Sequence, residues 1–183
     1  MRTVFISAGH SNTPGRDMGA VGNGYIEGRL TVELRNLVIT ELAKLGIKAE
    51  RDGDNSVTIE TVNFIKKKLL APNSILVDFH FNAATPAATG AEVIIPASFS
   101  AFERDMADEL SAYIAVTLGI RNRGRKTEAQ TARGKLAWMR SAGENILPEI
   151  CFITNPGDMT SYQNKKGELV KGIAAIIHKW AQK

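Results

Sequence analysis

Short apolar runs alternate along this chain with longer segments in which apolar residues recur every three or four positions. The short runs predict strands over residues 3–8, 47–51, 74–81, 91–95 and 146–153. Helical spacing predicts one helix from Leu30 to Leu45, ended by Gly46, and others over residues 57–70, 99–118 and 162–180. Strands that alternate with helices in this way are typical of an α/β sandwich, with a mostly parallel sheet flanked by helices.

The size of the chain favours one domain over residues 1–183. Of its 183 residues, 44% are hydrophobic, which is enough to bury a substantial single core. Its one cysteine cannot form an internal disulfide, and three histidines are too few for several finger-type metal sites. Two polar stretches, residues 11–24 and 121–135, are predicted to be loops, and we place the second near a site or at a mobile edge.

The charge of the chain is basic, with a net charge of +4 and a pI near 9.3. Such a charge favours anionic partners in general, among them nucleic acids, membranes and acidic wall polymers. The densest basic runs, residues 66–68 and 121–125, contain no aromatic residue that would stack on bases, so we predict no nucleic-acid partner. No apolar run reaches transmembrane length, and the N-terminus lacks the features of a signal peptide. The sequence does not define the oligomeric state.

Four polar residues lie in or beside predicted strands and helices where a core residue would be expected: His10, Glu27, His80 and Glu149. The carboxyl ends of parallel strands meet at one edge of a sheet, so the side chains of His10, His80 and Glu149 are predicted to reach that edge. A hydrolytic zinc site needs three protein ligands and an open position, and His10, Glu27 and His80 supply such a set. Glu149, inside an apolar run, is then the candidate general base.

Each of these residues also has an ordinary structural interpretation. A single histidine at a strand end is more often a hydrogen-bonded structural group than a ligand, and Glu27 is also consistent with a favourable charge at a helix N-terminus. Cys151 lies two positions from Glu149, and strand alternation predicts both on one face, which leaves a thiol nucleophile as an alternative to a buried apolar role. Glu92 is expected to line a groove or to orient a metal-binding histidine, and His178 to be structural or exposed.

Several motifs in order along the chain resemble the zinc-dependent N-acetylmuramoyl-L-alanine amidases often called amidase family 3. The motifs are ISAGHS (6–11), GAVGNGYIE (19–27), RDGD (51–54), DFHFNA (78–83), GAEV (90–93), NRG (122–124) and LPEICFITNPGD (147–158). The basic stretch at residues 121–135 matches the family poorly apart from NRG.

The resemblance implies one zinc ion per chain held by His10, Glu27 and His80, with Glu149 as catalytic acid and base. It also implies a sheet of about six strands and hydrolysis of the amide between the lactyl group of N-acetylmuramic acid and L-alanine in peptidoglycan. We expect synthesis in the cytoplasm and action on the cell wall or in the periplasm, in wall lysis or remodelling, with a phage or prophage endolysin as one such role. The alternatives are an inactive peptidoglycan-binding module and a hydrolase dependent on Cys151.

Overall fold

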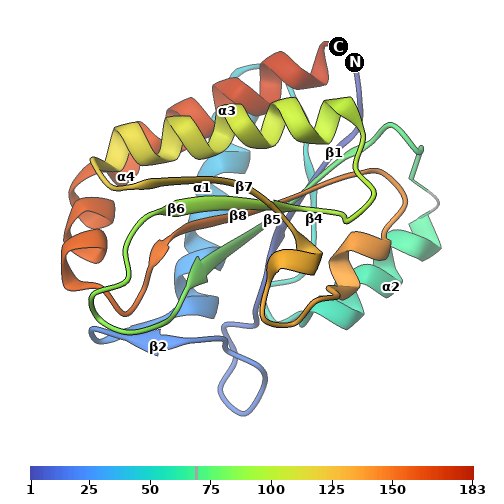
Figure 1. Cartoon of the computed structure of the whole chain (residues 1–183). Helices are drawn as coiled ribbons and strands as arrows, with labels where there is room; N and C mark the ends of the chain where they lie inside the picture. Colours follow the sequence, from blue (N-terminus) through green and yellow to red (C-terminus); the bar gives the residue numbers. More distant parts are fainter. Residues whose placement is uncertain (69) are drawn as a thin grey trace.

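A six-stranded sheet in the order β4-β1-β5-β8-β6-β7 forms the centre of the computed structural model, which describes residues 1–68 and 70–183 (Figure 1). The strands are β1 (Val4–Ala8), β4 (Glu50–Arg51), β5 (Ile75–Asn82), β6 (Ala91–Ile95), β7 (Asn122–Thr127) and β8 (Glu144–Phe152). Strands β4, β1, β5 and β8 run parallel to one another, whereas β6 runs antiparallel to β8 and parallel to β7. The prediction of a single α/β domain with a mostly parallel sheet is confirmed.

The helices cover the two faces of this sheet unequally, and Figure 1 shows α3 and α4 above the sheet and α2 below it. The helices are α1 (Glu27–Lys44), α2 (Thr58–Lys68), α3 (Ala101–Leu118) and α4 (Pro156–Ala181), with short 3-10 helices η1 (Glu128–Gln130) and η2 (Ala137–Arg140). The main core lies between the sheet and α1, α3 and α4, and a smaller cluster lies under α2 and η2. No helix of the described residues has the length and apolar character to cross a membrane.

Strand alternation places polar side chains of β5 on the less covered face. Val77 and Phe79 point into the main core, whereas Leu76 points into the smaller cluster. Because side chains alternate along a strand, Asp78 and His80 share the face of Leu76. This face of the sheet therefore has an apolar part under α2 and a polar part beyond it.

Helix ends follow local capping. Helix α3 begins after Ser100, which forms a capping box with Glu103, so it starts slightly later than predicted. Helix α4 begins at Pro156, capped by the Asn155 side chain, well before the predicted residue 162. Its first turns are polar, which hid the helical spacing there. The predicted helix 57–70 is α2, and residue 69 of that prediction lies outside the described residues.

Three predicted segments differ from the structure. The predicted loop at residues 11–24 contains β2 (Val21–Gly22), which pairs with β3 (Tyr25–Ile26) through an Asn-Gly turn. The predicted strand 47–51 is reduced to β4, which has two residues. The predicted loop 121–135 contains the strand β7 and the helix η1, so the loop assignment is wrong for those residues, while the predicted place at an edge is confirmed. Strand β7 carries no large apolar residue, so its sequence lacked a strand pattern.

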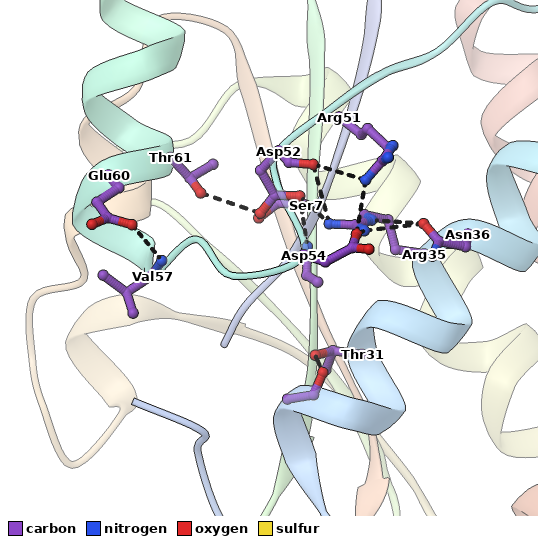
Figure 2. A network of polar contacts seen from close by, with 12 residues as sticks. Ser7, Thr31, Arg35, Asn36, Arg51, Asp52, Asp54, Val57, Glu60 and Thr61 are labelled. Carbon is purple, nitrogen blue, oxygen red and sulfur yellow. Dashed lines mark hydrogen bonds and ion pairs between the residues drawn. The ribbon is translucent and has the colours of Figure 1, made fainter. Parts of the chain in front are cut away.

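A buried polar network joins the elements that lead to the candidate site (Figure 2). Arg35 of α1 is fully buried and donates to Asp52 Oδ1 at 2.6 Å and also to Asp54. Asp52 in turn accepts from Ser7 Oγ of β1 at 2.8 Å and from Thr61 Oγ1 of α2 at 3.2 Å. Burial raises the pKa of Asp52, and the charge of Arg35 opposes this rise. The network therefore fixes β1 and α1, the elements that position the candidate metal ligands described below.

Candidate metal centre

His10, Glu27 and His80 converge at the carboxyl ends of β1 and β5, as the sequence predicted. One potential ligand atom from each lies within 4.8 Å of the other two. Glu27, the first residue of α1, lies between the rings, with Oε2 3.4 Å from His10 Nε2 and Oε1 3.0 Å from His80 Nδ1. The imidazole rings are nearly perpendicular, with centroids 5.0 Å apart. Two nitrogen ligands and one carboxylate in this arrangement form a three-ligand site of the kind used by hydrolytic zinc enzymes.

The Glu27 carboxylate is held in place by backbone donors. The N–H groups of Phe81 and Ala20 donate to Oε1 and Oε2 at 3.0 and 2.8 Å. Burial opposes its charged form, but the hydrogen bond and charge of His80, together with the charge of His10, lower the pKa of Glu27 to about 2. Glu27 is therefore ionised at neutral pH and ready to bind a cation.

Space around His80 is limited by the chain that leads to His10. A Cβ atom at Gly9 would lie 2.1 Å from the His80 ring, so only glycine allows the chain after β1 to pass this close. The glycine of the ISAGHS motif is therefore required for steric reasons, because it allows His10 and His80 to face the same point.

Two further carboxylates face the outer nitrogens of the histidines. Asp78 Oδ2 lies 3.2 Å from His80 Nε2, and Asp17 Oδ1 lies 3.1 Å from His10 Nδ1. Burial disfavours charge on His80, but the charges and hydrogen bonds of Asp78 and Glu27 outweigh burial and raise its pKa well above the ordinary value. The carboxylates around the two histidines thus favour a positive charge between the rings, and a bound divalent cation would provide one.

Glu149 lies next to His80, because the two residues are register partners across β8 and β5. Its Oε2 is buried and has no hydrogen-bond partner among the described residues. Burial raises the pKa of Glu149 to about 8; His80 opposes this rise, while the nearby carboxylates of Glu27 and Glu92 add to it. A buried carboxyl group with a free oxygen and a pKa near neutrality is suited to accept and return a proton.

A groove of about 1010 Å³ runs over these residues and exposes them to a substrate. Glu92 lines it, as predicted, but its carboxylate contacts Arg123, Lys126 and Asn82 and no histidine. The predicted orienting role of Glu92 is therefore wrong, and Asp78 occupies that position. The signal for Asp78 was present in the sequence: an acidic residue two positions before His80 in a strand shares its face.

Cys151 does not lie on the face of Glu149. The pairing of β8 with β5 is irregular here, since His80 pairs with Glu149 but Asn82 pairs with Phe152. This bulge adds one residue to β8 and turns Cys151 into the main core, where its Sγ lies 4.0 Å from Met159 Sδ. Burial raises the pKa of the thiol well above its ordinary value, with contributions from Asp158 and Glu149. The predicted common face of Cys151 and Glu149 is therefore wrong, and the burial of Cys151 in the core agrees with the predicted apolar role and disfavours a nucleophilic one.

His178 lies near the end of α4, where its ring contacts Gln182 at 3.3 Å, and it does not contribute to the candidate metal centre, as predicted.

Comparison with known proteins identifies the family of this chain. A family described as N-acetylmuramoyl-L-alanine amidase matches residues 4–179. The chain belongs to this family. Its match extends over His10, His80, Glu27 and Glu149, so the whole candidate site lies within the family region.

Individual proteins are also similar to this chain in sequence or in fold. The uncharacterized protein YqiI of Bacillus subtilis is 29% identical over 181 residues, which cover 94% of this chain and 83% of that protein. The N-acetylmuramoyl-L-alanine amidase LytC of the same species is 27% identical, covering 92% of this chain but only 34% of LytC. The crystal structure of N-acetylmuramoyl-L-alanine amidase from Clostridium difficile 630 has the same fold, with a TM-score of 0.82 at 21% identity, covering 100% of this chain and 97% of that one.

Proposed function

We propose that this chain is a zinc-dependent amidase that hydrolyses the bond between the lactyl group of N-acetylmuramic acid and L-alanine in peptidoglycan. One observation carries the proposal: the His10, Glu27 and His80 ligand atoms lie within 4.8 Å of one another, beside the free buried oxygen of Glu149 and beneath an open groove. The family and its relatives indicate the substrate, and the geometry supports the hydrolytic chemistry.

The residues present fit one zinc ion per chain. His10 and His80 would each provide a nitrogen ligand and Glu27 a carboxylate oxygen, which leaves a position open for substrate or water. When bound, zinc polarises the scissile carbonyl and lowers the pKa of water. Asp78 Oδ2 lies 3.2 Å from His80 Nε2 and would accept the Nε2–H of His80 when Nδ1 is the ligand atom.

Glu149 moves the proton. In its ionised form it takes a proton from the water that attacks the amide carbonyl, and it then donates that proton to the leaving nitrogen of L-alanine. Burial raises the pKa of Glu149 in the metal-free chain, which favours the protonated form that donates to the leaving nitrogen. The ionised form of Glu149 would be favoured in the first step by a zinc ion held by His10, Glu27 and His80, because Glu149 is the strand neighbour of His80. The products are a muramyl lactyl carboxylate and a peptide with a free L-alanine amine.

Product analysis on purified peptidoglycan tests this assignment. The expected result is one new amine, that of L-alanine, with no new reducing sugar ends. New reducing ends, or new amines from residues other than L-alanine, would contradict the assigned bond. Retention of the protein on peptidoglycan with no released product in the presence of zinc would instead indicate an inactive binding module.

The proposal places the enzyme at the cell wall or in the periplasm, in wall lysis or remodelling, and includes the role of a phage endolysin. Adding purified protein to intact and to membrane-permeabilised cells distinguishes access to the cell wall from activity on the wall. Lysis only after permeabilisation supports an enzyme that meets the wall from the cytoplasmic side.

A further inference from the structure

One wall of the groove is basic and comes from residues 121–135, the segment that the sequence predicted to be a loop. Arg123 and Lys126 of β7 and Arg133 and Lys135 of the following loop all line the groove. Because β6 lies next to β8 and β7 lies next to β6, this basic wall is two strands away from Glu149. We define these four residues as the basic wall.

A β-bulge directs two cations of β7 to the same side. Ala91 pairs with Asn122, but its neighbour Glu92 pairs with Gly124, so Arg123 is an extra residue in β7. Gly124 has a φ of 72°, a left-handed conformation that glycine adopts without strain. Alternation alone would turn Arg123 away from Lys126, and the bulge restores it to the groove face.

Glu92 orders this pair without neutralising it. Arg123 Nε donates to Glu92 Oε2 at 2.6 Å, and Lys126 Nζ lies 2.8 Å from the same oxygen. The Arg123 guanidinium also lies 5.1 Å from the centre of the Phe152 ring. Two cations share one carboxylate, so the pair keeps a surplus positive charge in a fixed position.

The loop that carries the outer pair, Arg133 and Lys135, is anchored at its base. Glu128 is buried and accepts from Arg140 Nη1 at 2.7 Å and from the Leu136 N–H at 2.7 Å. Trp138 of η2 is buried in the smaller core cluster. The side chains of Arg133 and Lys135 are exposed to solvent at the groove. They are therefore presented by an ordered loop.

The groove is apolar where the start of α2 lines it. Val57 and Ile59 also line the groove, and Ile59 is 55% exposed, which is high for an isoleucine. The groove thus combines an apolar region with a basic wall, and a substrate that is neutral in one part and anionic in another would match it. In a muramyl peptide the sugars are neutral and the peptide stem carries the carboxylates.

We infer that the basic wall binds carboxylates of the peptide stem and makes the enzyme selective for stems in which those carboxylates are free. This inference rests on the proposed function, since it concerns the substrate of the same site. Attraction between exposed charges is screened by salt, so the selectivity should weaken as ionic strength rises.

The test compares two soluble muramyl peptides that differ only in whether the stem carboxylates are free or amidated. The wild type should cleave the acidic peptide with kcat/KM on the order of tenfold higher, mainly through a lower KM. The double variant Arg133→Gln/Lys135→Gln should lose most of this preference by losing activity on the acidic peptide alone. Lys126→Gln should also reduce the preference for the acidic peptide. Glu92 stays paired with Arg123 in this variant, so the pH profile of kcat should not change.

A matched control is Lys48→Gln/Lys171→Gln, which removes two exposed cations outside the groove and should leave both rates unchanged. Equal cleavage of both peptides by the wild type, or an equal loss on both peptides in the outer-pair variant, would overturn this inference alone. The Arg133→Gln/Lys135→Gln variant could instead lose activity only on whole cell walls that carry phosphate polymers. This result would also overturn the inference, because it would show that the basic wall binds phosphate. Failure of the wild type to cleave either peptide would overturn the proposed function as well.

Discussion

Replacing Glu149 by Gln separates the chemical role of this carboxyl group from its effect on stability. The amide is nearly isosteric with the carboxyl group but cannot accept a proton from water at neutral pH. General acid-base groups contribute roughly 10²-fold to 10⁴-fold to turnover. Since Glu149 acts twice in the proposed cycle, the zinc-loaded variant should lose activity in the upper part of this range while keeping its zinc.

The same substitution should make the metal-free protein more stable at alkaline pH. Burial raises the pKa of Glu149 from 4.5 to about 8 in the folded chain. The folded state therefore binds more protons than the unfolded state between these values, and stability falls as pH rises through this window. At about 1.4 kcal/mol per pKa unit, the loss above pH 8 is on the order of 5 kcal/mol as an upper bound. The side-chain amide of the Glu149→Gln variant does not titrate, so the variant avoids this loss.

Urea denaturation of both proteins in chelator, at several pH values, measures the difference. The variant should be more stable by several kcal/mol above about pH 8, and the two proteins should converge near pH 4. A constant difference across this range would refute the argument that Glu149 is a buried acid with a raised pKa. Turnover near the wild-type rate, or inactivity due only to missing zinc, would refute the proton-transfer role.

Three further substitutions test other parts of the site. Cys151→Ser should retain most activity and cost about 1–3 kcal/mol in urea denaturation, because a hydroxyl replaces a buried thiol; abolished turnover in the folded, zinc-loaded variant would restore the thiol mechanism. Asp78→Asn should weaken zinc binding by roughly 10-fold to 100-fold in a competition with a chelating dye, because it no longer accepts a charge-assisted hydrogen bond from His80; an unchanged affinity would remove Asp78 from the site. Arg35→Met should destabilise the chain by about 3–5 kcal/mol in urea, since it leaves Asp52 buried without its ion-pair partner; a loss below about 1 kcal/mol would show that the network is not required.

The sequence predicted the parts of this structure that follow regular periodicity. The strands around residues 3–8 and 74–81 are apolar enough to identify, and their order placed His10 and His80 at one edge of the sheet. Those two residues and Glu27 then converge as expected, with ligand atoms within 4.8 Å. The two candidate histidine ligands were thus accessible to sequence reasoning, because strand ends that topology brings together carry both of them.

The features that sequence reasoning missed arise where periodicity is interrupted. The bulge in β8 turns Cys151 into the main core, away from the face that alternation predicts. The bulge in β7 turns Arg123 to the groove face, although alternation predicts that it faces away from the groove. Strand β7 is stabilised by pairing with β6 at the sheet edge and not by apolar side chains, so its polar sequence resembled a loop. Pairing partners of this kind are distant in sequence and are not encoded in the local pattern.

Zinc titration of the metal-free protein tests the central claim most directly. Activity on a muramyl peptide should be absent in chelator and should return in proportion to added zinc, reaching its maximum at one equivalent per chain. His10→Ala and His80→Ala should each abolish zinc retention, while Lys171→Gln retains it. Full activity in the metal-free protein, or full zinc occupancy in both histidine variants, would contradict the account.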